Sequence, residues 1–344
     1  MRCGWLFCRT MSAKALRAAQ PDSLAAVKPA VRIERLPDGR HRISVEGKSG
    51  ASGPCRSWVT SYPPALIREI VATKRAYVCD EIMREEDPSY VEHALRHEVL
   101  GYVEPAEFAG KRVLDFGCGA GASTMVLSRL LPGCELVGIE LQERLLKLAR
   151  LRARHFGRRN VRFLRSPAGD SLPGDLGEFD YIVLSAVFEH LLPEERAALL
   201  PRIWRHLKTG GVLFLNQTPH RYSAIEFHTT GLPLINYLPD GIAMRVARRF
   251  SPHVRRDMQW EEMLRAGIRG ATVGEVLRIL SKQGSPALLA PRRGVGDRID
   301  LWYAKLSPRR AWLKRSLWAS LKAGKRITGL ELTPQLALAI RKHA

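Results

Sequence analysis

Short apolar runs alternate with longer amphipathic stretches through the middle of this 344-residue chain. Each run has the length of one buried strand, and the stretches between the runs repeat their apolar residues at helical spacing. The runs that we expect to form strands are Arg112–Phe116, Glu135–Glu140, Val161–Arg165, Phe179–Leu184 and Val212–Asn216. Strands that alternate with helices in this way favour a doubly wound parallel sheet.

Different patterns flank this region. Val31–Val45 predicts two short strands around a Pro-Asp-Gly turn, and the glycine- and serine-rich segment Gly47–Pro54 predicts a flexible linker. Apolar residues then fall on helical faces from Pro64 to Tyr102. Beyond the fifth strand we expect a helix that ends at Glu275–Ser281 and a late strand at Ile299–Lys305.

The last part of the chain surrounds a stripe of leucines with basic residues. Leu313, Leu317 and Leu321 recur at four-residue spacing beside two tryptophans. A basic amphipathic helix of this kind is typical of an anchor on an anionic membrane surface, which would here be formed by residues 308–326. An ordinary helix that packs its apolar stripe on the domain explains the same pattern, so both interpretations stay open.

The chain is strongly basic, with 55 Lys and Arg against 34 Asp and Glu and a net charge of +21. Nucleic acid and anionic membranes are partners that suit this charge, although an arginine-rich solvated surface explains it equally well. The six cysteines form no C-x-x-C pair, which argues for a reducing compartment and against a disulfide framework or a zinc site. No apolar run approaches the ~20 residues of a membrane span. The first ten residues are too short and too weakly apolar for a secretory signal, and Met11 is an alternative start.

The most specific motif is V-L-D-F-G-C-G-A-G at Val113–Gly121. Its glycines follow Asp115 at a strand end and precede a helix, and their missing Cβ atoms let the backbone approach a ligand closely. The next strand ends at Glu140, where a carboxylate can accept hydrogen bonds from ribose hydroxyls. The spacing is G-x-G-x-G, whereas the dinucleotide pattern is G-x-G-x-x-G. A carboxylate such as Asp115 also favours a cationic ligand over a pyrophosphate.

This motif resembles motif I of the class I S-adenosylmethionine (SAM)-dependent methyltransferases, and three further blocks support the resemblance. V-G-I-E supplies the ribose-binding acid, and L-K-T-G-G-V-L-F-L-N-Q-T-P resembles the family's L-K-P-G-G turn and fifth strand. F-D-Y-I-V-L-S-A-V-F-E-H-L-L-P is similar to the fourth-strand block of the branch that includes the ubiquinone-biosynthesis O-methyltransferases. The resemblance covers roughly Tyr90–Lys305. It implies a mostly parallel seven-stranded Rossmann-like sheet with an antiparallel last strand, an N-terminal helical cap, and SAM as the cofactor.

The resemblance also implies which residues bind the cofactor. They are Asp115, Gly117, Cys118, Gly119, Gly121, Glu140, Leu141, Ala168, Asp170 and Ser185. Leu141 is expected to stack on the adenine. Many relatives carry a Gly-Asp pair after the third strand, whose carboxylate contacts the adenine amine, whereas Ser166-Pro167 stands at that place here. Either a reshaped loop lets Asp170 serve, or the backbone of Ala168 alone reads the adenine, or Asp170 is a solvated loop acid.

Methyl transfer from a sulfonium is an in-line displacement, so the protein must mainly hold the reacting atoms collinear in a dry site. A general base is needed only when the acceptor is a hydroxyl or another protonated group. Because open α/β sheets bind ligands at the carboxyl ends of their strands, the catalytic candidates follow the fourth and fifth strands: Glu189, His190, His220 and His228. We prefer His190 as the base because a Glu-His pair lies just past Ser185. The alternative is that His190 begins a helix and bonds nearby backbone.

The segment at 217–240 is too long and too rich in polar and aromatic residues for a plain connection, and we interpret it as an acceptor-binding lid. Its residues His220, Glu226 and His228 have side chains that suit a metal, but the fold of the loop is unknown and we predict no metal site. The expected organisation is an N-terminal appendage and linker at 1–61, a helical cap at 62–104, a methyltransferase domain at 105–307 and a basic amphipathic tail at 308–344.

The leading hypothesis is a SAM-dependent methyltransferase that acts on an oxygen, less readily on a nitrogen, of a small, lipid-linked or glycan acceptor. An RNA methyltransferase is the second hypothesis; the charge favours it, but the Asn/Asp-Pro-Pro-Tyr type of motif is absent. A non-catalytic SAM-binding regulatory protein is the third, opposed by the retained cofactor acids and polar loop. We expect a cytoplasmic protein, peripheral to the inner face of the membrane if residues 308–326 bind lipid. The sequence identifies neither the acceptor nor the oligomeric state.

Overall fold

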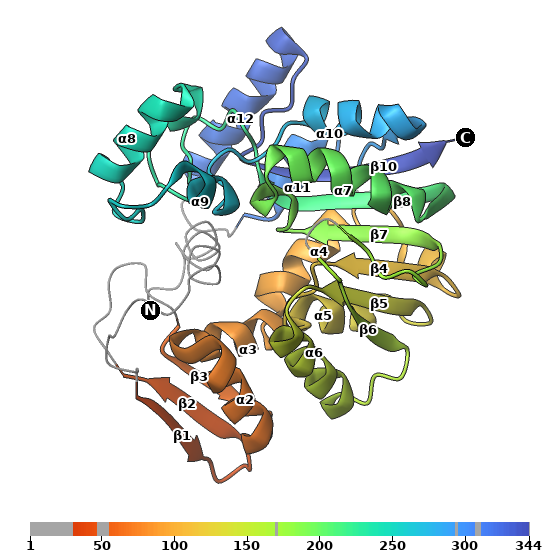
Figure 1. The fold of residues 1–344 in the computed structure, drawn as a ribbon, viewed down its shortest axis with the longest axis vertical. Coiled ribbons are helices and arrows are strands. Elements are labelled where there is room, and N and C mark those ends of the chain that lie inside the picture. Colours follow the sequence, from red (N-terminus) through yellow and green to blue (C-terminus); the bar gives the residue numbers. More distant parts are fainter. Residues whose placement is uncertain (1–29, 47–54, 169–170, 293–294, 307–310, 344) are drawn as a thin grey trace. The chain divides into compact units, whose positions relative to one another are not determined.

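The computed structural model describes five stretches of the chain (Figure 1), namely residues 30–46, 55–168, 171–292, 295–306 and 311–343. The expected linker at Gly47–Pro54 and the start of the chain lie outside these residues. The described chain divides into two compact units. The N-terminal unit consists of residues 30–96 and 105–168, and the C-terminal unit of residues 97–104 and the described residues from 171 onward.

The N-terminal unit begins with a small antiparallel sheet of β1 (Val31–Arg35), β2 (His41–Val45) and β3 (Ser57–Thr60). The first two strands confirm the pair expected around the Pro-Asp-Gly turn. The third was not expected, because four residues after a glycine-rich stretch are too few to show a period. Ile43 of β2 is completely buried and packs with Tyr62 in an apolar cluster that the following helices complete.

Those helices fall within the range, Pro64 to Tyr102, in which the sequence predicted helical faces. They are α2 (Pro64–Lys74), η1 (Arg75–Tyr77), α3 (Val78–Glu86), η2 (Pro88–Glu92) and α4 (His93–Glu98), followed by η3 (Pro105–Phe108). The fully buried Arg152 ties α3 to the glycine-rich turn, since its guanidinium donates to Glu81 Oε1 at 2.9 Å and to the Ala120 carbonyl at 2.7 Å. Loss of one partner would leave a buried charge unpaired, so this link holds the turn firmly.

Three parallel strands complete the N-terminal unit. They are β4 (Arg112–Phe116), β5 (Glu135–Glu140) and β6 (Val161–Arg165), connected by α5 (Ala122–Leu130) and α6 (Glu143–His155). β4 and β5 are buried on both faces, which explains why each reads as a nearly continuous apolar run. The register pairs Asp115 with Gly138 and Glu140 with Arg165. Both acids therefore lie near the carboxyl ends of their strands.

The C-terminal unit is built on β7 (Phe179–Ser185), α7 (Pro193–Arg205) and β8 (Leu207–Pro219), a parallel strand–helix–strand arrangement. Pro193 occupies the first position of α7 and two glutamates lie in its first turn, as the helix dipole favours. β9 (Ser285–Leu288) and β10 (Gln335–His343) extend these strands, β10 running antiparallel to both β8 and β9.

A helical insertion, residues 220–272, separates β8 from α10 (Val273–Leu280). It contains η5 (Ile235–Tyr237), α8 (Asp240–Phe250) and α9 (Trp260–Arg265). These elements share a buried apolar cluster of their own, formed by Ile235, Ala243, Ala247, Val254, Met258, Met263, Ala266 and Ile268. The segment expected to be a lid at 217–240 is thus the first part of a larger folded insertion. After α10 the chain passes through η6 (Ser281–Gln283).

The strand predicted at Ile299–Lys305 is wrong, because this segment forms helix α11 (Arg298–Ala304). Ile299 and Leu301 alternate as they would in a strand, but Trp302 is also buried, and buried neighbours at this spacing fit a helix face. Asp297 caps the helix by accepting from the Asp300 N–H. The antiparallel strand comes instead from β10, beyond the residue-307 boundary of the predicted domain.

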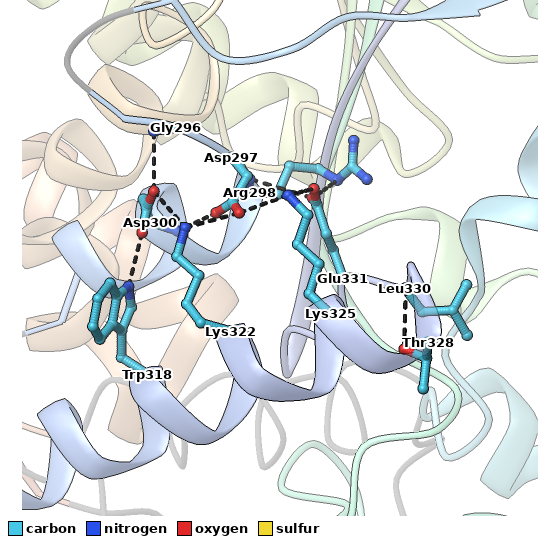
Figure 2. A network of polar contacts seen from close by, with 10 residues as sticks. All are labelled: Gly296, Asp297, Arg298, Asp300, Trp318, Lys322, Lys325, Thr328, Leu330 and Glu331. Atoms are coloured by element: carbon cyan, nitrogen blue, oxygen red, sulfur yellow. Dashed lines mark hydrogen bonds and ion pairs between the residues drawn. The ribbon is translucent and has the colours of Figure 1, made fainter.

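The segment expected to be a basic tail forms helix α12 (Ala311–Thr328) and then β10. Figure 2 shows that one face of α12 points toward α11 and the turn before it. Lys322 pairs with Asp297 and Asp300 at 2.8 and 2.7 Å. Trp318 Nε1 also donates to Asp300 at 2.8 Å. On the exposed side, Trp312 is 70% accessible. α12 is therefore held on one face and exposed on another.

Together these strands form a seven-stranded sheet of order β6-β5-β4-β7-β8-β10-β9, besides the three-stranded sheet β1-β2-β3. The pairs β4–β5, β5–β6 and β7–β8 are parallel, and the pairs made by β10 are antiparallel. The prediction of a mostly parallel, seven-stranded Rossmann-like sheet is confirmed. In the described stretches of the chain, none of the helices has both the length and the apolar character that crossing a membrane requires.

Candidate active site

The glycine-rich turn between β4 and α5 has the backbone that its sequence predicts. Gly117, Gly119 and Gly121 all have positive φ, at 74°, 55° and 82°, which favours glycine. Gly121 serves packing, since a Cβ there would lie 2.8 Å from the Ala149 Cβ. At Gly119 a Cβ would meet nothing within 4 Å. Gly119 therefore presents bare backbone to open space, as a ligand-binding turn must.

Glu140 lies at the end of β5 and closes this turn. Its Oε2 accepts from the Gly119 N–H at 3.1 Å, and its Oε1 accepts from the Gln142 N–H at 2.9 Å. An ionised carboxylate offers about four acceptor positions, so the half-buried Glu140 retains capacity for hydroxyl donors. Leu141 follows it and is 44% exposed. The turn thus combines a carboxylate for a ribose with an apolar side chain available for stacking.

Asp115 and Cys118 support the turn from within. Asp115 is buried, and its Oδ2 accepts from the hydroxyls of Ser123 at 3.0 Å and Thr124 at 2.7 Å, which ties β4 to the start of α5. Burial raises the pKa of Asp115, although those hydroxyls oppose the shift. Burial and the nearby acids raise the pKa of the Cys118 thiol well above its ordinary value. Cys118 is therefore an unreactive packing residue.

The loop after β6 departs from the family pattern, and the structure shows how it is held. The Ser166 N–H donates to the Glu140 carbonyl at 3.0 Å, and the Ser166 hydroxyl donates to the Ala168 carbonyl at 3.1 Å. Ser166 is buried while Ala168 is exposed. The backbone of Ala168 is thus accessible beside the end of β5. Asp170 lies outside the described residues.

Three of the four catalytic candidates come together in the C-terminal unit. Glu189 and His190 belong to η4 (Phe188–His190) just after β7, and His228 comes from the insertion. Glu189 Oε1 lies 3.7 Å from His190 Nε2 and 3.7 Å from His228 Nε2. Because His228 is distant in sequence, only the fold of the insertion brings it to the Glu-His pair.

Backbone carbonyls orient both imidazoles of this cluster. His190 Nδ1 lies 2.7 Å from the Arg265 carbonyl, and His228 Nδ1 lies 2.9 Å from the Ala266 carbonyl. A carbonyl only accepts, so each Nδ1 carries the proton and each Nε2 presents a lone pair toward Glu189. The other carboxylate oxygen of Glu189 accepts from the Thr218 hydroxyl at 2.9 Å. The neutral tautomers are therefore fixed by the backbone after α9.

Burial governs the charges of this cluster. Burial raises the pKa of Glu189, although His190 and the Thr218 hydroxyl act in the opposite direction. Burial, assisted by His190, lowers the pKa of His228 to about 3. The His190 side chain is 28% exposed, whereas those of Glu189 and His228 are 0% and 4% exposed. His190 is thus the member of the cluster that can exchange a proton with an incoming group or with solvent.

Residues that the sequence analysis did not select hold the cluster in place. A Cβ at Gly267, where φ is 93°, would lie 2.8 Å from His228 Nδ1 and 3.2 Å from Glu189 Cγ. The buried Arg196 donates to the Glu189 carbonyl at 3.3 Å and to the Gly270 carbonyl at 2.7 Å. Thr218 fixes the carboxylate. No sequence motif marks these residues, since each acts through contacts that are distant in sequence.

Several polar atoms around the ends of β7 and β8 are buried with no hydrogen-bond partner among the described residues. They are Ser185 Oγ, Glu189 Oε1, His228 Nε2 and both side-chain polar atoms of Asn216. Two non-glycine residues nearby also have positive φ, Ala186 at 56° and Gln217 at 61°. Unsatisfied buried atoms and backbone strain are costly in a folded protein and are typical of places where a ligand binds.

The remaining candidates lie in the insertion but outside this cluster. His220 Nδ1 accepts from the Tyr222 N–H at 3.1 Å, and burial lowers the pKa of His220. With His228 and Phe227 it lines a small cavity. The Glu226 carboxylate is occupied by the backbone N–H groups of His228, Thr229 and Thr230. In the part of the chain that is described, His220 and Glu226 thus form no metal-ligand group with His228.

The glycine-rich turn lies within the region of this chain that is similar to known proteins. Residues 114–213 match the family described as a methyltransferase domain. The ubiquinone biosynthesis O-methyltransferase of Xanthomonas euvesicatoria pv. vesicatoria is 34% identical over 135 residues, which are 38% of this chain and 54% of that protein. The carboxy-S-adenosyl-L-methionine synthase of Campylobacter curvus is 26% identical over 41% of this chain and 57% of that protein.

The chain spans about half the length of the curated relatives it matches. Among solved structures, the YcgJ protein of Bacillus subtilis is similar over 72% of this chain and 99% of its own, at 15% identity and a TM-score of 0.41. A SAM-dependent methyltransferase of Clostridium acetobutylicum is similar over 44% of this chain and 59% of its own, at 18% identity and a TM-score of 0.35.

Proposed function

We propose that this chain, which belongs to the class I SAM-dependent methyltransferases, transfers a methyl group to a hydroxyl oxygen of a small aromatic acceptor. SAM is the cofactor of this domain. The observation that carries the acceptor proposal is the Glu189–His190–His228 cluster, whose bare Nε2 atoms and unpartnered carboxylate oxygen suit a protic acceptor group.

The glycine-rich turn has the features that the cofactor needs. In this proposal Glu140 accepts hydrogen bonds from the ribose hydroxyls, and the open backbone of Gly119 lies against the cofactor. The exposed Leu141 stacks on the adenine, and Asp115 keeps the turn in position through Ser123 and Thr124. A ligand without phosphate suits this negatively charged turn better than a dinucleotide would.

The cofactor supplies a methyl group on a sulfonium, which is already a good leaving group. The chain must therefore position the acceptor oxygen and remove its proton. We assign the proton to His190 Nε2, since the Arg265 carbonyl fixes the opposite ring nitrogen as the donor and the side chain is partly exposed. Glu189 Oε1, which lies 3.7 Å from the same ring nitrogen, then stabilises the resulting imidazolium by its negative charge. Ser185 and Asn216 are available to orient the acceptor.

An aromatic acceptor is favoured by the side chains of the insertion. Seven apolar or aromatic residues there are more than a third exposed: Tyr222, Ile225, Phe227, Leu234, Tyr237, Ile242 and Phe250. Phe227 also lines the small cavity that reaches His220 and His228. Such surfaces suit the apolar body of a ligand, with a few polar groups to orient its reactive end. The name of one relative, an O-methyltransferase of ubiquinone biosynthesis, supports the same class of acceptor.

A lipid-linked acceptor would also explain the exposed face of α12. Trp312, Leu313 and Leu317 are 70%, 44% and 45% exposed, and Arg315 and Arg326 are exposed on the same helix. Apolar and tryptophan side chains among arginines suit the interface of an anionic bilayer. We propose that this face of α12 rests on the membrane from which the acceptor is taken.

The proposal is tested by methyl transfer from labelled SAM into three fractions of a cell extract: lipid, small polar molecules and RNA. We expect label in an aromatic lipid or small-molecule fraction, in a product that resists the mild base which cleaves esters. His190→Ala should reduce turnover by about 10²–10⁴-fold, the range of general-base catalysis, with unchanged SAM affinity. Label confined to RNA would overturn the proposal and would support the basic-charge hypothesis.

A further inference from the structure

We infer that Glu189, His190 and His228 bind one divalent transition-metal ion through Glu189 Oε1 and the two Nε2 atoms. These are the residues in the described part of the chain whose potential ligand atoms form such a group, all lying within 4.8 Å of one another. Two imidazoles with one carboxylate suit ions of the zinc, iron or cobalt class rather than magnesium or calcium. The sequence pointed to His220, Glu226 and His228 as a metal set but predicted no site, because the fold of their loop was unknown.

The distances fit a shared ion better than they fit hydrogen bonds. At 3.7 Å, both the Glu189–His190 and the Glu189–His228 atom pairs are too far apart for a hydrogen bond. An ion about 2.1 Å from each ligand separates tetrahedral ligand atoms by roughly 3.4 Å. The two Glu189 pairs need to close by only a few tenths of an ångström, and the two Nε2 atoms, which lie within 4.8 Å of each other, need a larger side-chain rotation.

The Nδ1 atoms of both histidines, which are not proposed ligands, make the hydrogen bonds that are usual for ligating histidines in metal sites. Ligating histidines usually donate their other N–H to a carbonyl or carboxylate, which fixes the tautomer and aims the free lone pair at the ion. Here the Arg265 and Ala266 carbonyls, adjacent in sequence, hold His190 and His228 in this way. The Thr218 hydroxyl fixes the carboxylate oxygen that is not a proposed ligand. All three proposed ligands are therefore oriented before any ion binds.

The proposed ligand atoms also lack other partners. Glu189 Oε1 and His228 Nε2 are buried acceptors without a hydrogen bond, and they face each other. Two lone pairs pointing at one another in a buried site repel, and at 3.7 Å the two atoms are too far apart to share a proton in a hydrogen bond. A cation between them satisfies both acceptors at once. A protein that used Glu189 only to orient His190 would not need His228 there.

Three protein ligands leave an open coordination position, as in catalytic zinc sites. The catalytic consequence rests on the proposed function: a hydroxyl bound at that position has a lowered pKa and releases its proton to solvent. The oxygen–methyl bond then forms as the sulfur–methyl bond breaks, with no change in oxidation state. In that case His190 acts as a ligand instead of accepting the proton itself.

The test uses the full chain, stripped with a chelator and then dialysed against Co²⁺ or Zn²⁺. We expect close to one ion per chain by elemental analysis, and visible absorption of protein-bound Co²⁺ that reports nitrogen and oxygen ligands. Glu189→Gln and His228→Asn should each weaken binding at least tenfold. His220→Asn is the matched control, because it changes a buried histidine of the same insertion outside the proposed ligand set, and it should bind normally.

Equal Co²⁺ binding by wild type and His228→Asn, or substoichiometric binding by wild type, would overturn the inference. SAM titration of each variant verifies that the unit with the cofactor turn is folded, and circular dichroism verifies the unit that carries the substitution. If one ion binds but no acceptor is methylated, the proposed function fails and the metal site stands. If stripped protein methylates at the full rate, the catalytic role of the ion fails, while the metal site is still decided by Co²⁺ binding and the methyltransferase proposal stands.

Discussion

Glu189 Oε1 and His228 Nε2 lie 3.7 Å apart, both buried and neither with a hydrogen-bond partner. The two residues come from different parts of the C-terminal unit, one directly after β7 and the other from the insertion. Their approach depends on Gly267, whose missing side chain leaves room for both. The polar cluster is therefore a product of the way in which the insertion folds back after β8.

The first prediction concerns acid stability. Burial holds the pKa of His228 at about 3 in the folded chain, while an unfolded histidine has a pKa near 6.5. Between these values the unfolded chain binds a proton that the folded chain does not, so stability falls as the pH is lowered from about 6.5 toward 3. We expect this residue to contribute on the order of 5 kcal/mol to that loss. Urea unfolding at several pH values measures it.

The His228→Gln variant is the control for that experiment. Glutamine does not titrate, so the difference in unfolding free energy between wild type and variant should shrink as the pH falls through this window. Buried acids with raised pKa, such as Glu189 and Glu226, act in the opposite direction, but they are present in both proteins and cancel in the difference to first order. A pH-independent difference would contradict the burial of a neutral His228.

Gly267→Ala should damage both stability and activity. The new Cβ would lie 2.8 Å from the His228 ring, at a φ of 93° that alanine rarely adopts. We expect a loss of roughly 1–3 kcal/mol in unfolding free energy and a fall in kcat as the cluster is displaced. Gly274→Ala offers a matched comparison, since its Cβ meets nothing and it lies within α10. There the same substitution should stabilise by about 0.5–1 kcal/mol. Equal effects at both positions would contradict the packing role of Gly267.

Local pattern predicted most of the fold, because the central strands are buried on both faces and read as apolar runs. The cofactor turn could be predicted equally well, because the glycines from 117 to 121 and Glu140 are close in sequence. Ile299 and Leu301 predicted a strand because they alternate as strand residues do, over a length too short to separate strand from helix. The cap at Asp297 is the signal that could have identified the helix.

The acid-histidine cluster lay beyond sequence reasoning for a different reason. Glu189, His190 and His228 were each selected as chemically suitable, but nothing local says which histidine of the insertion approaches the Glu-His pair. His228 does so because the Ala266 carbonyl accepts a hydrogen bond from its ring, and because the missing side chain of Gly267 leaves room for that ring. Glu226 also has a carboxylate that suits a metal, but it accepts hydrogen bonds from the backbone N–H groups of its own turn instead. Contacts of this range are decided by tertiary packing alone.

Glu140→Gln should weaken SAM binding by about 10–100-fold. The substitution preserves the shape of the side chain but removes the charge that strengthens its hydrogen bonds to hydroxyls, which are worth about 1.5–3 kcal/mol when one partner is ionised. Isothermal titration with SAM measures the change. Glu143→Gln, three residues later on the exposed surface of α6, should leave the affinity unaltered. Unchanged affinity in Glu140→Gln would refute the assignment of the ribose-binding acid.

The exposed face of α12 gives the last prediction, for membrane binding. Replacing Trp312 and Leu317 by serine removes two apolar side chains, each worth about 1.5–3 kcal/mol when buried in an apolar phase. We expect partitioning onto vesicles of anionic lipid to fall by on the order of 10²-fold, and binding by wild type to weaken with salt because Arg315 and Arg326 contribute charge. Phe250→Ser replaces an exposed apolar residue on α8 and controls for a general loss of surface hydrophobicity.

The variants leave the Lys322 contacts to Asp297 and Asp300 intact, so α12 should stay docked. If the double variant sedimented with the vesicles as strongly as wild type does, α12 would not face the lipid.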